Sequence, residues 1–310
     1  MRVLLATDFS SQAEKARALA ARLSLAAGSA VRVVHAIEPL TTVTAFTSAP
    51  ILDLGDEAER EVRGELERFA APLRSPERTV EIDLLFGHAS DVIVAEAERF
   101  GADLVVVGSR GRGGIASMLL GSVSAEVVDR APCPVLVARG DTLTRILLAE
   151  DGSASASVGA QVIADLPPLR SLPVRVVSVV DLPVPYATGG DPLATAALRG
   201  YQEVLPRLRI EHERLARERA TARWAAGIGA SSEVREGDPA TEIIAAAEKD
   251  KSDLIVIGSR GQTGLTRLLL GSVARAVLFR APGSVLIAHA PTTGRTASRT
   301  GDADRVAVAT

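Results

Sequence analysis

A glycine-rich segment occurs twice in this chain, and its residue types suit the binding of an anion. Gly-Ser-Arg-Gly, nine further residues and Gly-Ser-Val run from Gly108 to Val123, and the pattern recurs from Gly258 to Val273, 150 positions later. Glycine lets the backbone turn sharply and approach a ligand, because no Cβ stands in the way. A helix that begins after such a turn offers unpaired N–H groups and the positive end of its dipole. The two segments therefore predict two phosphate-binding turns.

The candidate phosphate ligands are mainly backbone N–H groups, with arginines beside them. Each charge-assisted hydrogen bond to phosphate contributes about 1.5–3 kcal/mol and the helix dipole about 0.3–1, so several backbone donors would dominate binding. In the alternative interpretation the serine only caps the helix, the glycines only shape a turn, and the arginines are exposed loop residues. The candidates are Gly108, Ser109, Arg110, Gly111, Arg112, Gly113, Gly114, Gly121, Ser122 and Val123, and Gly258, Ser259, Arg260, Gly261, Gln262, Thr263, Gly264, Gly271, Ser272 and Val273.

An aspartate follows the first expected strand of each copy. Asp8 and Asp151 could accept hydrogen bonds from ribose hydroxyls, or help to hold a metal ion attached to the phosphates. The alternative is that each aspartate caps the helix that begins just after it. Near the end of the second expected strand, Ala36 and Val179 could line a base pocket, although core residues have the same character. The apolar candidates at these strand ends are Ala6, Ala36, Ala149 and Val179.

The chain lacks the residue patterns of common nucleotide-hydrolysing enzymes. It has no Gly-x4-Gly-Lys-Ser/Thr loop, which excludes a P-loop NTPase, and neither glycine segment contains a lysine. Arginine clamps phosphate well but is a poor general base. The histidines show no metal-ligand spacing and no acid–base partner: His35, His88, His212 and His289. We therefore expect no efficient ATP turnover, and slow hydrolysis is left open.

Composition excludes several classes of protein. The net charge is −3, so electrostatics gives no case for nucleic acid or an anionic membrane as the main partner. Cys133 is the single cysteine, which excludes an intramolecular disulfide and is compatible with a reducing cytosol. No uncharged apolar run approaches the roughly 20 residues that span a bilayer. We expect a soluble, cytoplasmic protein.

The duplication extends well beyond the glycine segments. Gly87 matches Gly237 and Asp103 matches Asp253 at the same offset of 150, whereas Asp8 corresponds to Asp151 at an offset of 143. Internal repetition of this kind points to fused copies of one domain. We call residues 1–140 the first repeat and residues 144–290 the second repeat. The short link Asp141–Thr144 predicts that the repeats pack tightly, and the polar tail of residues 291–310 is expected to be disordered.

Each repeat alternates short β-branched runs with helical patterns. Near-continuous Val, Ile and Leu content is typical of parallel strands covered on both faces. For each repeat we therefore predict an α/β fold with a doubly wound, five-stranded open parallel sheet. Ligands bind such sheets at the carboxyl ends of the strands, where the winding reverses. If strands one and four both reach one ligand, they must be neighbours, which gives the order 3-2-1-4-5. The expected strands are Arg2–Ala6, Ala30–Ile37, Val80–Phe86, Leu104–Val107 and Val135–Val137, then Arg145–Leu148, Val174–Val180, Ser232–Arg235, Leu254–Ile257 and Val285–Ala288.

The helices are less evenly repeated than the strands. In the first repeat the spacing predicts helices over Ser11–Ala27, Asp53–Ala71, Ser90–Phe100 and Ser122–Arg130. In the second repeat a longer helix, around Tyr201–Ala226, is crowded with Arg and Glu. Its charges predict a solvated helix face with i,i+4 pairs, and a partner-binding helix is the alternative. The segments Pro39–Leu52 and Leu182–Pro192 are expected to be loops.

The pattern Gly-x2-Gly-x9-Gly-Ser, with an aspartate after the first strand, resembles the ATP-binding branch of the universal stress proteins. Both repeats carry it, and the openings Leu-Leu-Ala-Thr-Asp-Phe-Ser and Leu-Leu-Ala-Glu-Asp-Gly-Ser are also similar to that family's first strand. The resemblance implies a Rossmann-like fold of the adenine nucleotide alpha hydrolase type and ATP, with magnesium, at each site. It also implies pairing of the repeats through their fifth, edge strands. Glu150 departs from the first repeat, which has Thr7 there, and would repel phosphate if it faced the ligand.

Three hypotheses follow for function. The first is a regulatory, stress-response protein that binds an adenine nucleotide at each repeat. The second is a slow ATP hydrolase or an adenylate-forming ligase, although the Ser-Gly-Gly-x-Asp-Ser loop of such ligases is absent. The third is a partner-binding scaffold in which one or both sites no longer function. The fused repeats can form an intramolecular pseudo-dimer, and a homodimer of the whole chain is left open.

Overall fold

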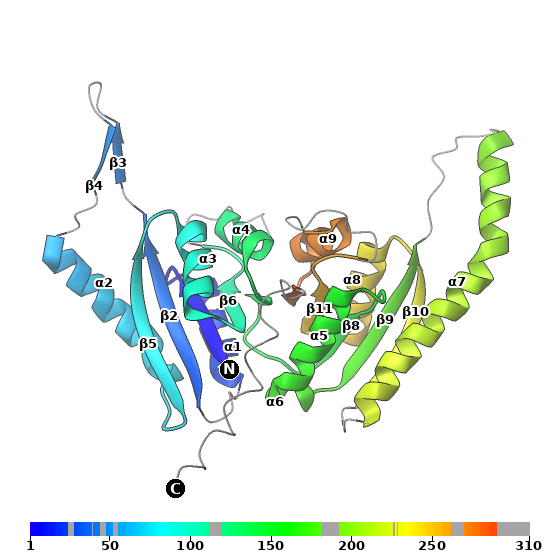
Figure 1. Cartoon of the computed structure of the whole chain (residues 1–310), viewed down its shortest axis with the longest axis horizontal. Helices are drawn as coiled ribbons and strands as arrows, with labels where there is room; N and C mark the ends of the chain where they lie inside the picture. Colours follow the sequence, from blue (N-terminus) through cyan, green and yellow to red (C-terminus); the bar gives the residue numbers. More distant parts are fainter. Residues whose placement is uncertain are drawn as a thin grey trace, which may run out of the picture.

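The structure is a computed structural model that describes most of the chain and centres on one large β-sheet. The described residues are 1–23, 28–38, 40–43, 48–51, 55–111, 120–181, 192–225, 227, 229–261 and 270–289. Ten strands form one sheet in the order β10-β9-β8-β11-β12-β7-β6-β1-β2-β5, which runs through both halves of the molecule (Figure 1).

Each repeat contributes five parallel strands in the same order, and this confirms the expected fold. The order in the first repeat is β5-β2-β1-β6-β7 and in the second β10-β9-β8-β11-β12, which is 3-2-1-4-5 when the main strands of each repeat are numbered along the chain. The strands are β1 (Arg2–Thr7), β2 (Ser29–Ile37), β5 (Arg78–Phe86), β6 (Leu104–Gly108) and β7 (Val135–Ala138), then β8 (Ile146–Ala149), β9 (Val174–Asp181), β10 (Ala230–Gly237), β11 (Leu254–Gly258) and β12 (Ser284–Ala288).

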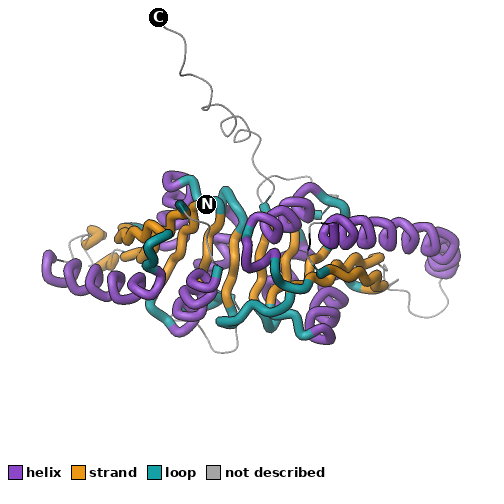
Figure 2. Tube along the Cα trace, turned by 90° about the horizontal axis from the view of Figure 1, so that it is seen from below, coloured by secondary structure: helices purple, strands orange, loops and turns teal. Residues whose placement is uncertain are grey.

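Helices cover both faces of the sheet, as the alternation of buried strand residues requires (Figure 2). Val3 and Leu5 of β1 face one core layer, whereas Leu4 and Ala6 face the other. On the first face lie α1 (Ser11–Arg22), α2 (Gly55–Ala70), α5 (Ala154–Asp165) and α7 (Pro192–Ala225), and on the second α3 (Ala89–Phe100), α4 (Ser122–Arg130), α8 (Pro239–Asp250) and α9 (Ser272–Arg280). Two short elements complete this set, the 3₁₀ helix η1 (Ala71–Leu73) and α6 (Pro167–Arg170).

The repeats join through antiparallel pairing of β7 with β12, in which Leu136 lies opposite Leu286. This is the edge-strand pairing that the family resemblance implies. The residue that follows each strand reaches into the other repeat. Arg139 donates to the backbone carbonyls of Leu278, near the end of α9, and of Gly283. At the equivalent place in the second repeat, His289 hydrogen-bonds to the backbone of Val128, near the end of α4.

We call this reciprocal arrangement of Arg139 and His289 the crossed caps. Arg139 is buried at the junction and His289 is partly buried, and their environments lower the pKa of both side chains. Burial and the charge of Arg110 lower the pKa of Arg139 to about 10, so it stays cationic at neutral pH. Burial and the charge of Arg260 lower the pKa of His289 to about 4, so it is neutral there. An ion pair between Arg275 and Asp129, 3.0 Å long, also crosses the junction.

Two segments differ from the sequence expectation. Part of the expected loop Pro39–Leu52 forms a small antiparallel hairpin, β3 (Leu40–Val43) with β4 (Ser48–Ile51). The β-branched Thr-Thr-Val run of β3 favours such pairing, although β4 contains Pro50. The long helix α7 begins at Pro192 rather than near Tyr201, because proline is well suited to the first turn of a helix. Helix α1 ends at Arg22, and residues 24–27 and 290–310 lie outside the described part of the chain.

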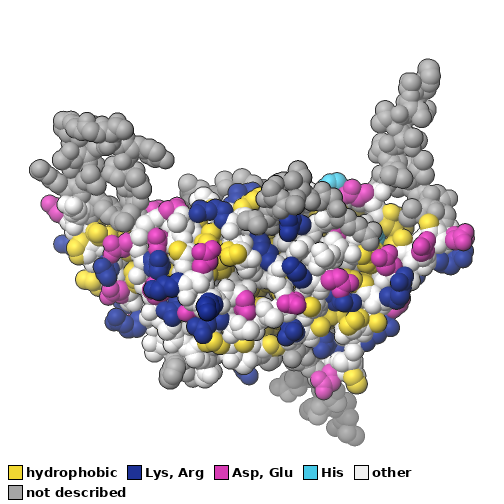
Figure 3. Space-filling view, turned by 180° about the vertical axis from the view of Figure 1, so that it is seen from behind, with side chains coloured by type: hydrophobic (Ala, Val, Ile, Leu, Met, Phe, Trp, Pro, Cys, Tyr) yellow, Lys and Arg dark blue, Asp and Glu magenta, His cyan; other side chains and the backbone are white. Residues whose placement is uncertain are grey.

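The visible surface carries charges of both signs. Over the face in Figure 3, basic and acidic side chains are interspersed rather than gathered into one patch. Helix α7 has two exposed i,i+4 ion pairs, Arg209–Glu213 and Arg214–Glu218, as its sequence predicts, and it buries Ala216 and Ala220 against the sheet. Within the described residues, no helix has both the length and the low polarity needed to cross a bilayer.

Candidate functional site

The glycine turn after β6 is held against the start of α4. The N–H of Gly121 donates to Ser109 O at 2.7 Å, and in the second repeat the N–H of Gly271 donates to Ser259 O at 2.8 Å. These bonds bring the two ends of each glycine segment together, although residues 112–119 and 262–269 between them are not described. Arg112, Gly113 and Gly114, with Gln262, Thr263 and Gly264, therefore lie outside the described residues.

The helices that begin at the turns have glycine N-caps, which carry no side chain. Gly121 is the N-cap of α4 and Gly271 the N-cap of α9, and no side chain of the described residues accepts from the first N–H groups of either helix. Ser122 and Ser272 are the first helical residues, so the alternative that Ser122 is the N-cap does not apply. A Cβ added to Gly121 would lie 3.4 Å from Arg110 Cα, in the space between the turn and the helix. Uncapped N–H groups beside such a space suit an anion.

The two aspartates lie against the turns and do not cap the helices. Ser10 and Ser153 are the N-caps, because their hydroxyls accept from the N–H groups of Ala13 and Ala156. Asp8 Oδ1 accepts from Ser10 N at 3.1 Å, and Asp151 Oδ1 accepts from Ser153 N at 2.9 Å. The other oxygen of each carboxylate faces the turn, since a Cβ on Gly111 would lie 2.6 Å from Asp8 Oδ2 and one on Gly261 would lie 3.1 Å from Asp151 Oδ2.

A cavity of about 520 Å³ opens at the carboxyl ends of the strands in the first repeat. Its volume lies within the range of about 300–1,000 Å³ that is usual for small-molecule sites. The glycine turn and the start of α4 form one end, and apolar residues of β2 and α3 form the other. The predicted residues in its lining are Ala6, Asp8, Ala36, Gly108, Arg110, Gly111, Gly121, Ser122 and Val123, and the structure adds Thr7, Ala13, Ala89, Ile93, Val107, Leu120 and Ser124.

The second repeat has an equivalent cavity of about 460 Å³. The predicted residues in its lining are Ala149, Asp151, Val179, Gly258, Arg260, Gly261, Gly271, Ser272 and Val273. The structure adds Glu150, Val177, Asp181, His212, Pro239, Ile243, Ile257, Leu270 and Ala274. Most of the apolar additions come from strands and from the helix after the third main strand, which the glycine pattern alone does not indicate. The others are Ala13 of α1, Ala274 of α9, and Leu120 and Leu270 just before the glycine N-caps.

Ser109 and Ser259, which we also predicted as ligands, do not line the cavities. Both residues are almost fully buried behind the turns. The Ser109 hydroxyl donates to Gln12 Oε1 at 3.2 Å, which directs it toward α1 and away from the cavity. Their backbone carbonyls instead accept from Gly121 and Gly271, so these serines support the turns.

Glu150 does not direct an unpaired negative charge at the second cavity. Its carboxylate is fully buried, and Oε2 lies 2.5 Å from Nε of Arg219 on α7. Oε1 accepts from the N–H of Gly152 at 2.9 Å. The repulsion of phosphate that the sequence suggests is therefore offset by a cation from α7.

His212 lines the second cavity, although its sequence pattern does not predict a ligand-binding role. It projects from α7, and its Nδ1 lies 2.8 Å from Oγ of Ser178 in β9. Its only sequence signal was a place within a charged helical run, which gave no reason to direct it toward the sheet. His35 and His88 are absent from the lining of the first cavity among the described residues.

Comparison with known sequences identifies the family. The sequence model of the universal stress protein family matches residues 1–139 and again residues 142–289. The chain belongs to the universal stress protein family. A universal stress protein of Mycolicibacterium smegmatis is 26% identical over 307 residues, which cover 92% of this chain and 96% of that protein. A universal stress protein encoded in the QAH/OAS sulfhydrylase 3′ region of Thermus aquaticus is 36% identical over 137 residues, covering 44% of this chain and 97% of that protein.

Solved structures share the tandem universal stress protein fold. The crystal structure of a universal stress protein from Archaeoglobus fulgidus matches with a TM-score of 0.64 over 93% of this chain and 98% of that chain. A universal stress protein from Pseudomonas aeruginosa matches with a TM-score of 0.58 over 93% and 92% of the two chains. Their sequence identities of 23% and 19% make these similarities of fold alone.

Proposed function

We propose that this universal stress protein binds ATP in each of its two cavities and acts as a regulatory, stress-response protein with little or no efficient hydrolysis. One observation carries the proposal. Each repeat places a glycine turn, an uncapped helix start and an aspartate around one cavity of nucleotide size. Because the arrangement occurs twice, it is not an accident of one loop.

The two ends of each cavity suit the two ends of a nucleotide. At one end, the N–H groups at the start of α4 or α9 and the side chain of Arg110 or Arg260 would hold phosphate oxygens. At the other end, apolar residues such as Ala36 and Ile93, or Val179 and Ile243, would enclose the base. The aspartate between them would accept from ribose hydroxyls.

We expect magnesium to bind together with the triphosphate, and the protein would supply only some of its ligands. No group of three His, Cys, Asp or Glu side chains in the described residues is arranged to hold a metal ion. Mg²⁺ usually keeps several waters and binds through one or two carboxylates together with the phosphates of the nucleotide. Asp8 and Asp151 are the carboxylates that could bind the magnesium ion in the two cavities.

Calorimetric titration with ATP tests the proposal, with an expected stoichiometry of two ATP per chain. In Gly121→Val and Gly271→Val, the new side chain would fill the space between the turn and the helix, so each variant should bind one ATP. The lost affinity should be about a hundredfold or more, since two charge-assisted hydrogen bonds contribute at least about 3 kcal/mol. Gly64→Val is the matched control, because nothing lies within 4 Å of a Cβ at that position.

Two results would contradict the proposal. Unchanged affinity in both site variants would mean that the nucleotide does not bind at the turns. Rapid multiple turnover of ATP with magnesium would contradict the absence of efficient hydrolysis. The cations beside the expected phosphates are Arg110 and Arg260, and because arginine is a poor general base we expect no efficient activation of water.

A further inference from the structure

The two cavities differ in one titratable group. Among the described lining residues, the second cavity contains an imidazole, His212 from α7, and the first contains none. The strand position occupied by Ser178 in the second repeat is held by His35 in the first. His35 Nδ1 lies 2.8 Å from Thr7 O, and its ring stacks on Phe9 with the centroids 4.5 Å apart. The first repeat thus uses an imidazole as structural support, whereas the second places one at the cavity.

Hydrogen bonding determines which nitrogen of His212 carries the proton. The Ser178 hydroxyl donates its single hydrogen to the backbone carbonyl of Glu150, at 2.7 Å. Its oxygen can then only accept from His212 Nδ1, 2.8 Å away, so Nδ1 is the protonated nitrogen. In the neutral ring Nε2 is therefore an acceptor. The described residues offer Nε2 no hydrogen-bond donor.

The strand order places His212 at the nucleoside end of the cavity. The glycine turn follows β11, and β8 lies between β11 and β9, the strand that carries Ser178. Neighbouring strands are about 4.8 Å apart, so the end of β9 is about 10 Å from the end of β11. A triphosphate held at the turn would direct its ribose and base toward β9. His212 would then meet groups that donate hydrogen bonds rather than phosphate oxygens.

We infer that His212 is a specificity residue of the second site, whose neutral Nε2 accepts a hydrogen bond from a donor on the nucleoside, either a ribose hydroxyl or the exocyclic amine of adenine. The inference rests on the proposed function, because it assumes that a nucleotide occupies the second cavity. It gives the two sites different selectivity: the second site discriminates against nucleotides that lack this donor, and the first site does not.

The surroundings of His212 keep it neutral at neutral pH. Burial lowers the pKa of His212, and the nearby charges of Glu211 on α7 and Asp151 after β8 oppose this effect without reversing it. Of the other charges on these elements, Glu150 is paired with Arg219, Glu236 of β10 is paired with Arg209, and Asp181 at the end of β9 lines the cavity. On acidification the ring gains a proton at Nε2, which then donates and no longer accepts. Affinity at the second site should therefore fall as the pH decreases.

The test uses Gly121→Val chains, in which the second site alone binds nucleotide. In that background, His212→Leu should weaken ATP binding about 3- to 10-fold, the contribution of one neutral hydrogen bond. His212→Gln supplies an amide oxygen as acceptor and should retain most of the affinity. The titrations are repeated with 2′-deoxy-ATP, 3′-deoxy-ATP and purine riboside triphosphate, each of which lacks one candidate donor. The analogue that lacks the donor bound by His212 should bind equally well with and without His212→Leu.

The pH series separates a binding role from a structural one. Between about pH 7.5 and pH 5, the range in which histidine titrates, affinity should fall further in the parent than in His212→Gln. The nucleotide's own titration is the same in both chains and cancels. Equal ATP affinity in the parent and His212→Leu, or identical pH profiles in the parent and His212→Gln, would overturn the inference while leaving the proposed function intact. Failure of Gly121→Val chains to bind ATP at any pH would instead show that the second site does not bind it.

Discussion

Positions 7 and 150 fill the same place in the two repeats with different chemistry. Thr7 Oγ1 accepts from the N–H of Phe9 at 3.0 Å, and Glu150 Oε1 accepts from the N–H of Gly152 at 2.9 Å. Both side chains therefore support the left-handed residue of the turn, Phe9 with φ 59° and Gly152 with φ 80°. The longer glutamate has a second oxygen left, which pairs with Arg219 and joins α7 to the rim of the second cavity.

Glu150→Gln tests this pair at the scale of one residue. The variant leaves Arg219 without its carboxylate, and we expect the free energy of unfolding to fall by about 1.5–3 kcal/mol, the contribution of a hydrogen bond between charged groups. ATP affinity at the second site should rise, because the cation near the triphosphate is no longer neutralised. Urea denaturation and calorimetry measure the two effects.

Glu218→Gln is the control for this prediction. It removes the partner of Arg214 from an ion pair in which both side chains are about 60% exposed. Such surface pairs contribute at most about 1 kcal/mol. A loss in Glu150→Gln no larger than in the control would mean that the buried pair does not stabilise the fold.

The glycine turns could be predicted from residue types, but the residues of α7 that lie near the second cavity could not. Gly121 and Asp8 recur at matching places in the second repeat, so spacing alone indicated a common site. His212 and Arg219 lie in a helix with no counterpart of equal length in the first repeat. Their direction depends on how α7 rotates as it packs Ala216 and Ala220 against the sheet, which local spacing does not specify.

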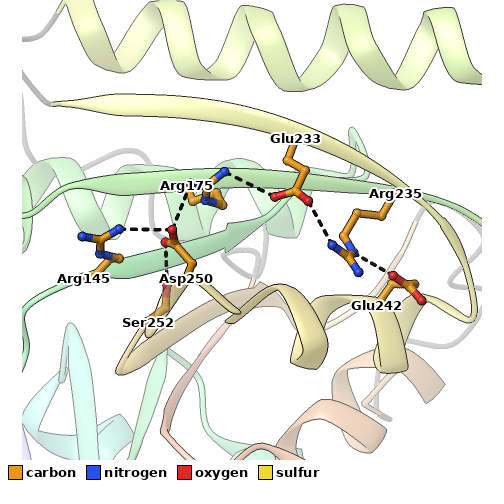
Figure 4. Close-up of polar contacts among 7 residues, drawn as sticks. All are labelled: Arg145, Arg175, Glu233, Arg235, Glu242, Asp250 and Ser252. Carbon is orange, nitrogen blue, oxygen red and sulfur yellow. Dashed lines mark hydrogen bonds and ion pairs between the residues drawn. The ribbon is translucent and has the colours of Figure 1, made fainter. Parts of the chain in front are cut away.

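At the scale of elements, an ion-pair network joins strands β9 and β10 to helix α8 (Figure 4). Arg175 donates to Asp250 at 2.9 Å and to Glu233 at 3.3 Å, and Arg235 continues the chain from Glu233 to Glu242. In the first repeat the equivalent arginine, Arg32, lies over the ring of Phe100, 4.3 Å from its centroid. Phe100 is the counterpart of Asp250. Arg32 also forms ion pairs with Glu81 of β5 and Glu96 of α3, so both repeats hold this helix by ion pairs and the first repeat adds a cation–π contact.

Asp250→Asn should destabilise the second repeat in a pH-dependent way. Burial raises the pKa of Asp250, but hydrogen bonds and charges from Arg175 and Arg145 outweigh burial, so its pKa lies below the ordinary value. The carboxylate thus stabilises the fold fully above the unfolded pKa of about 4, and this stability is lost as the pH falls through the folded pKa. Urea denaturation should show a difference between parent and variant at neutral pH that shrinks in acid.

Asp141→Asn provides the comparison, because Asp141 is exposed in the link between the repeats. Its unfolding free energy should follow that of the parent at every pH. A constant difference between Asp250→Asn and the parent down to low pH would contradict the assigned ion pairs.

All ten main strands could be predicted to within a few residues, because the central parallel strands are continuous apolar runs and the second repeat follows the same order of elements as the first. The hairpin β3–β4 was missed, since its strands are short and one contains Pro50, which reads as a loop signal. The start of α7 was missed because the segment after Pro192 has no apolar periodicity. Pro206 inside α7 is a second conflicting signal, which the long helix tolerates.

At the scale of the whole molecule, the pairing of β7 with β12 converts two five-stranded sheets into one. The register is almost symmetrical, with Leu136 opposite Leu286 and Val137 opposite Val285. Each edge strand is covered by the other, so neither presents unpaired backbone groups at the junction. The remaining edges are β5 and β10, which carry charged residues such as Glu81 and Glu233.

A fragment of residues 1–140 should form a dimer, because β7 would otherwise expose an apolar edge and can pair with a second copy of itself in the same register. Light scattering after size-exclusion chromatography measures the mass. Leu136→Lys places a charge at the buried centre of that pairing and should give a monomer. A monomeric parent fragment would contradict the prediction. Glu57→Ala serves as the control substitution, because Glu57 is exposed on α2, which packs on β2 and β5.

The crossed caps have a consequence for the energetics of ligand binding. Helix α4 begins at the first cavity and is held near its far end by His289, which directly follows β12, and α9 begins at the second cavity and is held by Arg139. If a bound anion shifts α4 or α9 along its axis, the shift must also strain the hydrogen bond that a residue of the opposite repeat makes near the end of that helix. Stepwise ATP affinities in the parent should accordingly differ from those of Gly121→Val and Gly271→Val, and linkage requires the same coupling factor in both directions. Identical ATP affinities in the parent and the variants would mean that the two repeats bind ATP independently of each other.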